Sequence, residues 1–173
     1  FADVSEQMAV KGIKIIHLWE DVWFTKKETV QSRLRAALGE TQRIPARLTK
    51  VRRIDKPTLD EFIQKNHLQV ATTAKYKYGL FLPKQYERII NTAHPSTHLL
   101  IQSFTHSEEV LVAVASFSGG KKIVREEVSY RSFELIRFAN RLNCTVVGGV
   151  DKLLKAFTKE VKPDDIMTYA DRD

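Results

Sequence analysis

Two adjacent glycines precede a predicted amphipathic helix near the C-terminal end of the chain, in the segment Val146-Val147-Gly148-Gly149. A glycine pair lets the backbone approach a ligand because no Cβ stands in the way. The first turn of the helix adds unpaired N–H groups and the positive end of the helix dipole, which together suit a pyrophosphate. Considered alone, such a pair is more often an ordinary turn. The residues expected to contact a cofactor are Val146, Val147, Gly148, Gly149, Val150 and Lys152.

Two other side chains are candidates for acid–base chemistry. His67 follows a helix for which Thr58 is the expected N-cap, and a neutral imidazole can deprotonate an amine. A histidine that bonds the last carbonyls of that helix explains His67 equally well. Glu134 and Arg137 are expected on opposite faces of one strand, so one of them should face solvent or a cleft. The candidate catalytic residues are therefore His67 and Glu134.

Basic residues dominate the chain, whose net charge is +7. This excess indicates a polyanionic or phosphate-bearing partner. If residues 44–54 form one strand, alternation places Arg43 and Arg47 on one face and Lys50 and Arg52 on the other. A solvated strand face and a phosphate-contacting stripe are equally good interpretations. The residues expected to contact nucleic acid are Arg43, Arg47, Lys50, Arg52 and Arg53.

No metal site is expected. His17, Glu20 and Asp21 are the one cluster of a histidine with carboxylates beside a predicted strand end, and a solvated strand exit is its favoured interpretation. Cys144 is the single cysteine, so the chain cannot form an internal disulfide, which fits a reducing compartment. The chain has no apolar run near ~18 residues and no signal peptide, so we expect a cytoplasmic protein without a membrane partner.

The elements that must position these residues follow from hydrophobic periodicity and capping signals. A turn at residues 106–109 joins two of the expected strands into a hairpin. The chain begins with Phe1 rather than Met, so we expect it to be trimmed or to start within a longer protein. We expect helices at residues 1–10, 25–38, 57–66 and 150–161, a helical turn at 86–90, and strands at 13–19, 44–54, 78–82, 99–104, 110–117, 133–138 and 165–170.

This order predicts an α/β (α+β) fold with a mixed, largely antiparallel sheet flanked by helices. Residues 1–54 form an N-terminal β-α-β appendage in this prediction, and residues 55–173 form the main domain. A sizeable core is possible because 43% of the residues are hydrophobic. The oligomeric state stays open.

The segment from Thr58 to Ala170 resembles the Gcn5-related N-acetyltransferase (GNAT) family in the order of its elements. The resemblance matches residues 134–140 to the strand before the cofactor loop and residues 146–150 to that loop. It matches residues 151–157 to the helix after the loop and 166–170 to the next strand. The usual loop reads Arg/Gln-x-x-Gly-x-Gly/Ala, whereas this chain has Cys144-Thr145-Val146-Val147-Gly148-Gly149. The family's last hairpin would lie beyond Asp173.

Taken over its whole length, the chain resembles uncharacterised phage and bacterial proteins in which a Vsr-like endonuclease end precedes a GNAT-like region. That resemblance implies that residues 1–40 are a nuclease remnant or the tail of a longer protein. Its segments are Ile16-His17-Leu18-Trp19-Glu20-Asp21, Phe62-Ile63-Gln64-Lys65-Asn66-His67-Leu68-Gln69, Glu134-Leu135-Ile136-Arg137-Phe138, Val146-Val147-Gly148-Gly149 and Tyr169-Ala170-Asp171-Arg172-Asp173.

Two functions follow. The GNAT resemblance implies an N-acyltransferase that uses acetyl-CoA or another acyl-CoA, with an unknown acceptor and with His67 or Glu134 as the base. The alternative is a DNA-binding or DNA-processing module of a mobile-element protein without acyltransferase activity, in which the basic residues contact nucleic acid. A GNAT-like scaffold without catalysis is a third interpretation, because a fold alone does not carry chemistry.

Overall fold

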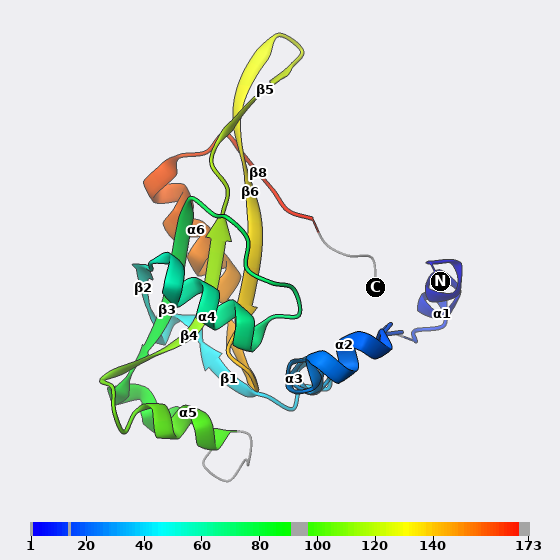
Figure 1. Cartoon of the computed structure of the whole chain (residues 1–173). Coiled ribbons are helices and arrows are strands. Elements are labelled where there is room, and N and C mark those ends of the chain that lie inside the picture. Colours follow the sequence, from blue (N-terminus) through cyan, green and yellow to red (C-terminus); the bar gives the residue numbers. More distant parts are fainter. Residues whose placement is uncertain (1, 14, 91–96, 170–173) are drawn as a thin grey trace.

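A computed structural model describes residues 2–13, 15–90 and 97–169 (Figure 1). The fold is mixed α/β, with a largely antiparallel sheet flanked by helices, as the sequence predicts. The helices are α1 (Ala2–Val10), α2 (Glu20–Thr25), α3 (Lys27–Ala37), α4 (Lys56–Asn66), α5 (His98–Ser103) and α6 (Gly149–Val161), with the 3-10 turns η1 (Ala46–Leu48) and η2 (Lys84–Ile89). The strands are β1 (Gln42–Pro45), β2 (Lys50–Arg53), β3 (Tyr76–Pro83), β4 (Glu109–Phe117), β5 (Lys121–Arg125), β6 (Val128–Asn140), β7 (Cys144–Val147) and β8 (Asp165–Met167).

The main sheet runs in the order β2-β3-β4-β6-β5, and all of these neighbours are antiparallel. The short strand β8 adds to β6 in parallel. A separate parallel pair joins β1 to β7, so residues 42–45 align with residues 144–147. The β1–β7 pairing ties the N-terminal third of the chain to the strand that leads into α6.

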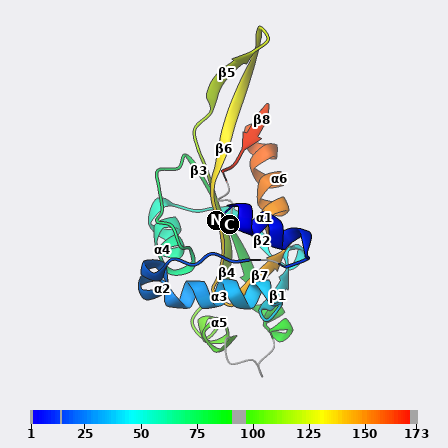
Figure 2. The ribbon, with the colours of Figure 1, turned by 90° about the vertical axis from the view of Figure 1, so that its right-hand side faces the viewer.

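Two helices cover opposite faces of the sheet, and Figure 2 shows α4 and α6 on either side of it. Alternation along β4 explains this arrangement. Ala113 and Ala115 belong to the core that α6 completes, whereas Val114 between them belongs to the smaller core that α4 completes. In the larger core the ring of Phe157 from α6 stacks on Phe117 with 4.0 Å between centroids.

The helices begin and end near the predicted positions, but their caps differ. Asp55, not Thr58, is the N-cap of α4, and its carboxylate accepts the backbone N–H of Thr58 at 2.9 Å. A carboxylate is a strong N-cap acceptor, and Pro57 fits the first turn because it needs no N–H partner there. Thr25, the first residue of the helix expected at residues 25–38, instead ends α2 and donates its hydroxyl to the Asp21 carbonyl at 2.7 Å.

Several predicted strands are wrong. Residues 15–19 form no strand, and residues 99–103 belong to α5, which buries Leu100, while Phe104 is buried directly after it. Those two positions are four residues apart and therefore share one helical face, which a short apolar run does not distinguish from a buried strand. The strand expected at residues 44–54 is interrupted by η1 directly after Pro45, because proline cannot donate to a continuing ladder.

A hairpin arm of β5 and the first part of β6 extends away from the body (Figure 1). The sequence did not predict β5, and it placed the start of β6 at residue 133 rather than Val128. The arm closes through a two-residue turn in which Glu126 and Glu127 both have positive φ, at 49° and 64°. Such values are typical of the hairpin turn that follows the twist of the strands, although glycine and asparagine are its usual residues.

Candidate anion-binding cleft

The predicted cofactor loop has the backbone that the sequence suggests. Gly148 is the N-cap of α6 with φ of 75°, a left-handed conformation that favours glycine, and no side chain caps the helix there. Gly149 is buried, and a Cβ at this position would lie 3.1 Å from Val146 Cβ and 3.4 Å from Leu80 Cδ1. Both glycines therefore have a local structural reason: one sets the turn and the other admits close packing of the helix on the core.

The charged side chains near this loop already have partners. The Lys152 ammonium donates to the backbone carbonyls of Ala46, at 2.8 Å, and Thr49, and burial lowers its pKa. Asp151 stands in the first turn of α6 and pairs with Lys155 at 2.8 Å. The carboxylate of Asp151 adds negative charge where an anion would bind. Lys152 therefore fastens η1 to α6 rather than extending toward a phosphate at the loop.

A cleft of about 710 Å³ lies along β6, beside the C-terminal end of α4, and we call it the β6 cleft. It brings together the two predicted catalytic residues, His67 and Glu134, which are distant in sequence. Cys144 and Thr145 line the cleft from β7, whereas none of the five loop residues 146–150 lines it. The lining residues are Thr29, Ser32, Arg33, Ala36, Asn66, His67, Leu68, Gln69, Glu134, Leu135, Ile136, Arg137, Phe138, Ala139, Asn140, Arg141, Leu142, Cys144, Thr145, Thr168 and Tyr169.

His67 enters the cleft because α4 ends there. It is the C-cap residue, and its backbone N–H donates to the Ile63 carbonyl at 2.9 Å while its own φ of −128° turns the chain away. Its ring Nδ1 lies 3.0 Å from the Gln69 backbone nitrogen, which donates to it. Burial lowers the pKa of His67 most, the hydrogen bond with the Gln69 backbone opposes this shift, and the charges of Arg137, Arg33 and Lys26 add to it. The ring is therefore neutral at pH 7.

Arg137 and Glu134 share one face of the sheet, and not the opposite faces that were predicted, because the register of β6 is irregular between them. The register of β6 against β4 shifts between Ser116 and Phe117, whose partners are Arg137 and Leu135. The extra residue on β6 is Ile136, and such a bulge changes the phase of the alternation by one position. The sequence carried no signal for this irregularity.

The Arg137 guanidinium lacks an anionic partner within the described part of the chain. One terminal nitrogen, Nη1, donates to the Ile136 carbonyl at 2.7 Å, and Nε is buried with no acceptor among the described residues. A buried donor without an acceptor costs free energy, and such groups often mark a position where an ion or a ligand belongs.

Other polar residues of the cleft hold the fold in place. The Asn66 amide bridges the α4 end and the turn after β6: it donates to the Phe62 carbonyl and accepts the Leu142 N–H at 2.7 Å. Asn140 Oδ1 accepts the Val146 N–H at 3.3 Å. Burial raises the pKa of Cys144 to about 12, so its thiol is protonated and unreactive. The two hydrogen bonds of the Asn66 amide therefore give this side chain a structural role and not one in acid–base chemistry.

The five residues of the predicted basic stripe lie on three elements, β1, η1 and β2. Arg52 forms an ion pair with Glu109 and lies over the Phe81 ring at 5.1 Å. Arg53 pairs with Glu160 at 3.9 Å and lies over the rings of Tyr76 and Tyr78. The remaining three residues, Arg43, Arg47 and Lys50, are exposed. Alternation on a single strand was therefore the wrong basis for this stripe, because β1 and β2 belong to different sheets.

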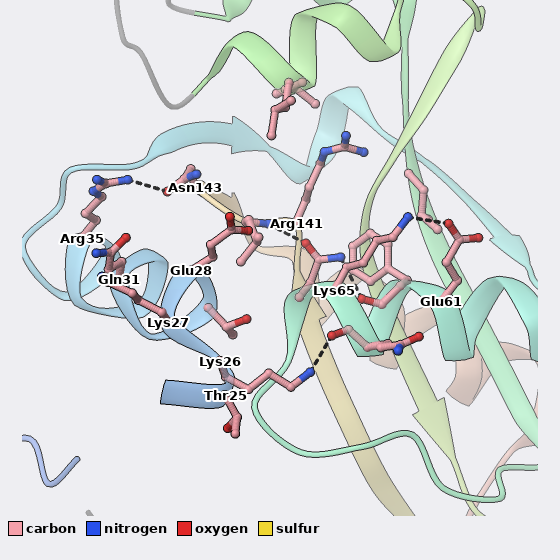
Figure 3. A pocket seen from close by; sticks show the side chains of 18 of the residues that line it. Thr25, Lys26, Lys27, Glu28, Gln31, Arg35, Glu61, Lys65, Arg141 and Asn143 are labelled. Carbon is pink, nitrogen blue, oxygen red and sulfur yellow. Dashed lines mark hydrogen bonds and ion pairs between the residues drawn. The ribbon is translucent and has the colours of Figure 1, made fainter. Parts of the chain in front are cut away.

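A second hollow of about 1070 Å³ lies on the other side of α3, between α2, α4 and α5 (Figure 3). Its cations have partners within the protein. Lys65 pairs with Glu61 at 2.6 Å, Arg35 donates to the Asn143 side chain, and Lys26 donates to the Gln64 carbonyl. This hollow is therefore a weaker anion site than the β6 cleft, although Arg141 lines both.

The cluster near the N-terminus does not form a metal site within the described residues. His17 Nε2 lies 2.7 Å from the Ser5 hydroxyl, while Glu20 and Asp21 begin α2. Over residues 2–13, 15–90 and 97–169, no three side chains of His, Cys, Asp or Glu gather as metal ligands. In the same residues, no helix has both the length and the apolar character that a membrane span requires.

Comparison of the chain with models of protein families, with curated proteins and with solved structures finds no match.

Proposed function

We propose that this chain is a nucleic-acid-binding module whose phosphate-contacting surface is the β6 cleft. The observation that carries the proposal is the charge of the lining, in which Arg33, Arg137 and Arg141 stand against a single acid, Glu134. Arginine is well suited to such a surface because its planar guanidinium binds phosphate through two parallel hydrogen bonds.

The elements around the cleft give these cations a fixed arrangement. Arg137 projects from a central strand, and Arg33 lies on α3, which Asn143 holds through its backbone N–H to the Ser32 hydroxyl at 2.7 Å. Arg141 is oriented by its bond to the Ser103 hydroxyl at 2.7 Å. A preorganised cationic site loses less side-chain entropy on binding than a set of flexible surface lysines.

The experiment is fluorescence anisotropy with labelled oligonucleotides, at several salt concentrations. The double variant Arg33→Gln/Arg137→Gln should bind at least tenfold more weakly, and the plot of log affinity against log salt should lose about two units of slope. The matched control is Lys155→Gln/Lys159→Gln, which removes two exposed cations from α6 on the other face of the sheet. Equal losses in both variants would point to net charge alone and contradict the proposal.

An acyl-CoA-binding activity is a second candidate, and one observation favours it. The first turn of α6 has no side-chain cap, so no side chain competes with a pyrophosphate for its leading backbone N–H groups. His67 and Glu134 do not line this loop, so a base for amine transfer would have to come from elsewhere.

Calorimetry with acetyl-CoA tests the second candidate. Val150 is 38% exposed in the first turn of α6, so Val150→Glu places a carboxylate at the loop without disturbing the core. If the loop binds the cofactor, this variant should abolish the heat of binding while Val128→Glu, on the distant arm, should leave it unchanged. Absence of binding to the unaltered protein at millimolar acetyl-CoA would remove this candidate.

A further inference from the structure

The β6 cleft has the size of a small-ligand pocket rather than of a duplex-binding surface. Its volume of about 710 Å³ falls within the range of roughly 300–1,000 Å³ that holds a drug-sized molecule or a nucleotide. A double helix offers its phosphates on a convex cylinder and keeps its bases stacked inside, so it cannot enter a space of this size. Only a base that has left the stack, or that was never paired, fits.

The lining provides a separate surface for each part of a nucleotide. Arg33 and Arg137 are the cations for the phosphate. Leu68, after α4, and Ile136, on β6, are apolar residues of the same lining. Tyr169 lies in the same lining, with 76% of its surface exposed. Stacking of bases on aromatic rings in a cationic groove is the general mode of single-strand binding.

We propose that the β6 cleft holds one unpaired nucleotide, so that the ligand class of this protein is single-stranded nucleic acid, with Tyr169 as the stacking platform. This inference rests on the proposed nucleic-acid-binding function and adds that the bound nucleic acid is single-stranded and not a duplex. A duplex would meet only outward cations such as Arg43 and Arg47, which lie outside the cleft.

The test measures anisotropy with three labelled probes of one sequence: single-stranded DNA, single-stranded RNA and the DNA duplex. The unaltered protein should bind at least one single strand about tenfold more tightly than the duplex. Tyr169→Ala should weaken single-strand binding about fivefold or more and leave duplex binding unchanged, because stacking requires an unpaired base. The two single-stranded probes show which sugar the cleft prefers.

Tyr130→Ala is the matched control, because Tyr130 is also an exposed aromatic but lies on the hairpin arm, at 37% exposure. It should bind every probe as the unaltered protein does. Circular dichroism melting of each variant checks that folding is intact, which we expect because Tyr169 is largely exposed.

The possible results separate the two proposals. Duplex binding that equals single-strand binding, and that still depends on Arg33 and Arg137, overturns the single-strand inference and keeps the proposed function. An equal effect of Tyr169→Ala on all probes also overturns the inference. Failure of the unaltered protein to bind any probe at low salt overturns both.

Discussion

The start of α6 and the β6 cleft are two candidate anion sites that differ in what they offer. The start of α6 supplies backbone: a left-handed Gly148 and the free N–H groups of a helix turn. The β6 cleft supplies side chains, above all Arg137 with its unsatisfied Nε. Near the loop, Lys152 is bonded to protein carbonyls and Asp151 contributes a negative charge. A glycine pair before a helix can therefore be explained by packing and by the turn alone, while the residues suited to bind an anion lie elsewhere.

The largest change in stability that would test this comparison is expected from the loss of packing at Gly149. Gly149→Val should lower the free energy of unfolding by about 3 kcal/mol, because its Cβ would lie only 3.1 Å from Val146 Cβ and its methyl groups would need further space. Urea denaturation measures the change. The control is Gly119→Ala, where a Cβ would have only Lys75 Cδ nearby, at 3.8 Å, and where stability should stay nearly constant. An equally stable Gly149→Val protein would show that this glycine is free for a ligand.

A smaller loss is expected when the ammonium that fastens η1 is removed. Lys152→Met should cost about 1.5 kcal/mol of stability, because the carbonyls of Ala46 and Thr49 lose a charged donor. Lys155→Met is the control, since its pair with Asp151 is exposed and should contribute little. Thermal melting compares the two proteins. If Lys155→Met proves the more damaging, the structural role given to Lys152 is wrong.

The left-handed turn at Gly148 predicts a third, still smaller effect. Gly148→Ala should destabilise the protein by about 1 kcal/mol, because an L-residue at φ of 75° is strained. Space is not the reason, because the nearest heavy atom to a Cβ would be Ala46 Cβ at 3.8 Å. Asparagine tolerates this conformation better than alanine, so Gly148→Asn should be milder. The reverse order in urea denaturation would contradict an explanation based on φ.

The smallest effect concerns pH and belongs to the cleft alone. The folded pKa of His67 lies below its ordinary value of 6.5, mainly through burial. The unfolded chain therefore protonates the His67 ring more readily than the folded protein does. The contribution of His67 to stability is complete above pH 6.5, and it is lost as the pH falls from there through the lower folded pKa. Between pH 7 and 5, the unaltered protein should lose more melting temperature than His67→Asn. Parallel losses in the two proteins would contradict this assignment.

Sequence patterns predicted the elements whose signals are local. The amphipathic helix expected at residues 150–161 is α6, which begins one residue earlier, and the strand at 110–117 is β4 with one residue added. In each of these segments, the spacing of the apolar residues and the residues at both ends can be read from the local sequence. The helix α5 was mistaken for a strand because six residues with a central Leu99-Leu100-Ile101 run fit both periods.

The candidate site could be predicted only in part. His67 and Glu134 both line the cleft, and their role in acid–base chemistry stays a prediction. The cleft itself requires α3, α4 and β6 to meet, and no local pattern carries that information. The bulge at Ile136 puts Arg137 on the same face as Glu134, so the positive charge of the cleft was not evident from alternation.

The turn at Glu126 and Glu127 makes the hairpin arm adjustable in length. Lys122 and Arg131 are paired across the arm, and the pairs continue one rung at a time up to the turn. Inserting or deleting residues in matched numbers on both strands keeps every remaining pair in register, and steps of two rungs also keep each side chain on its face. Protein engineers can therefore lengthen the arm or graft a peptide onto its tip while the contact of β6 with β8 stays unchanged.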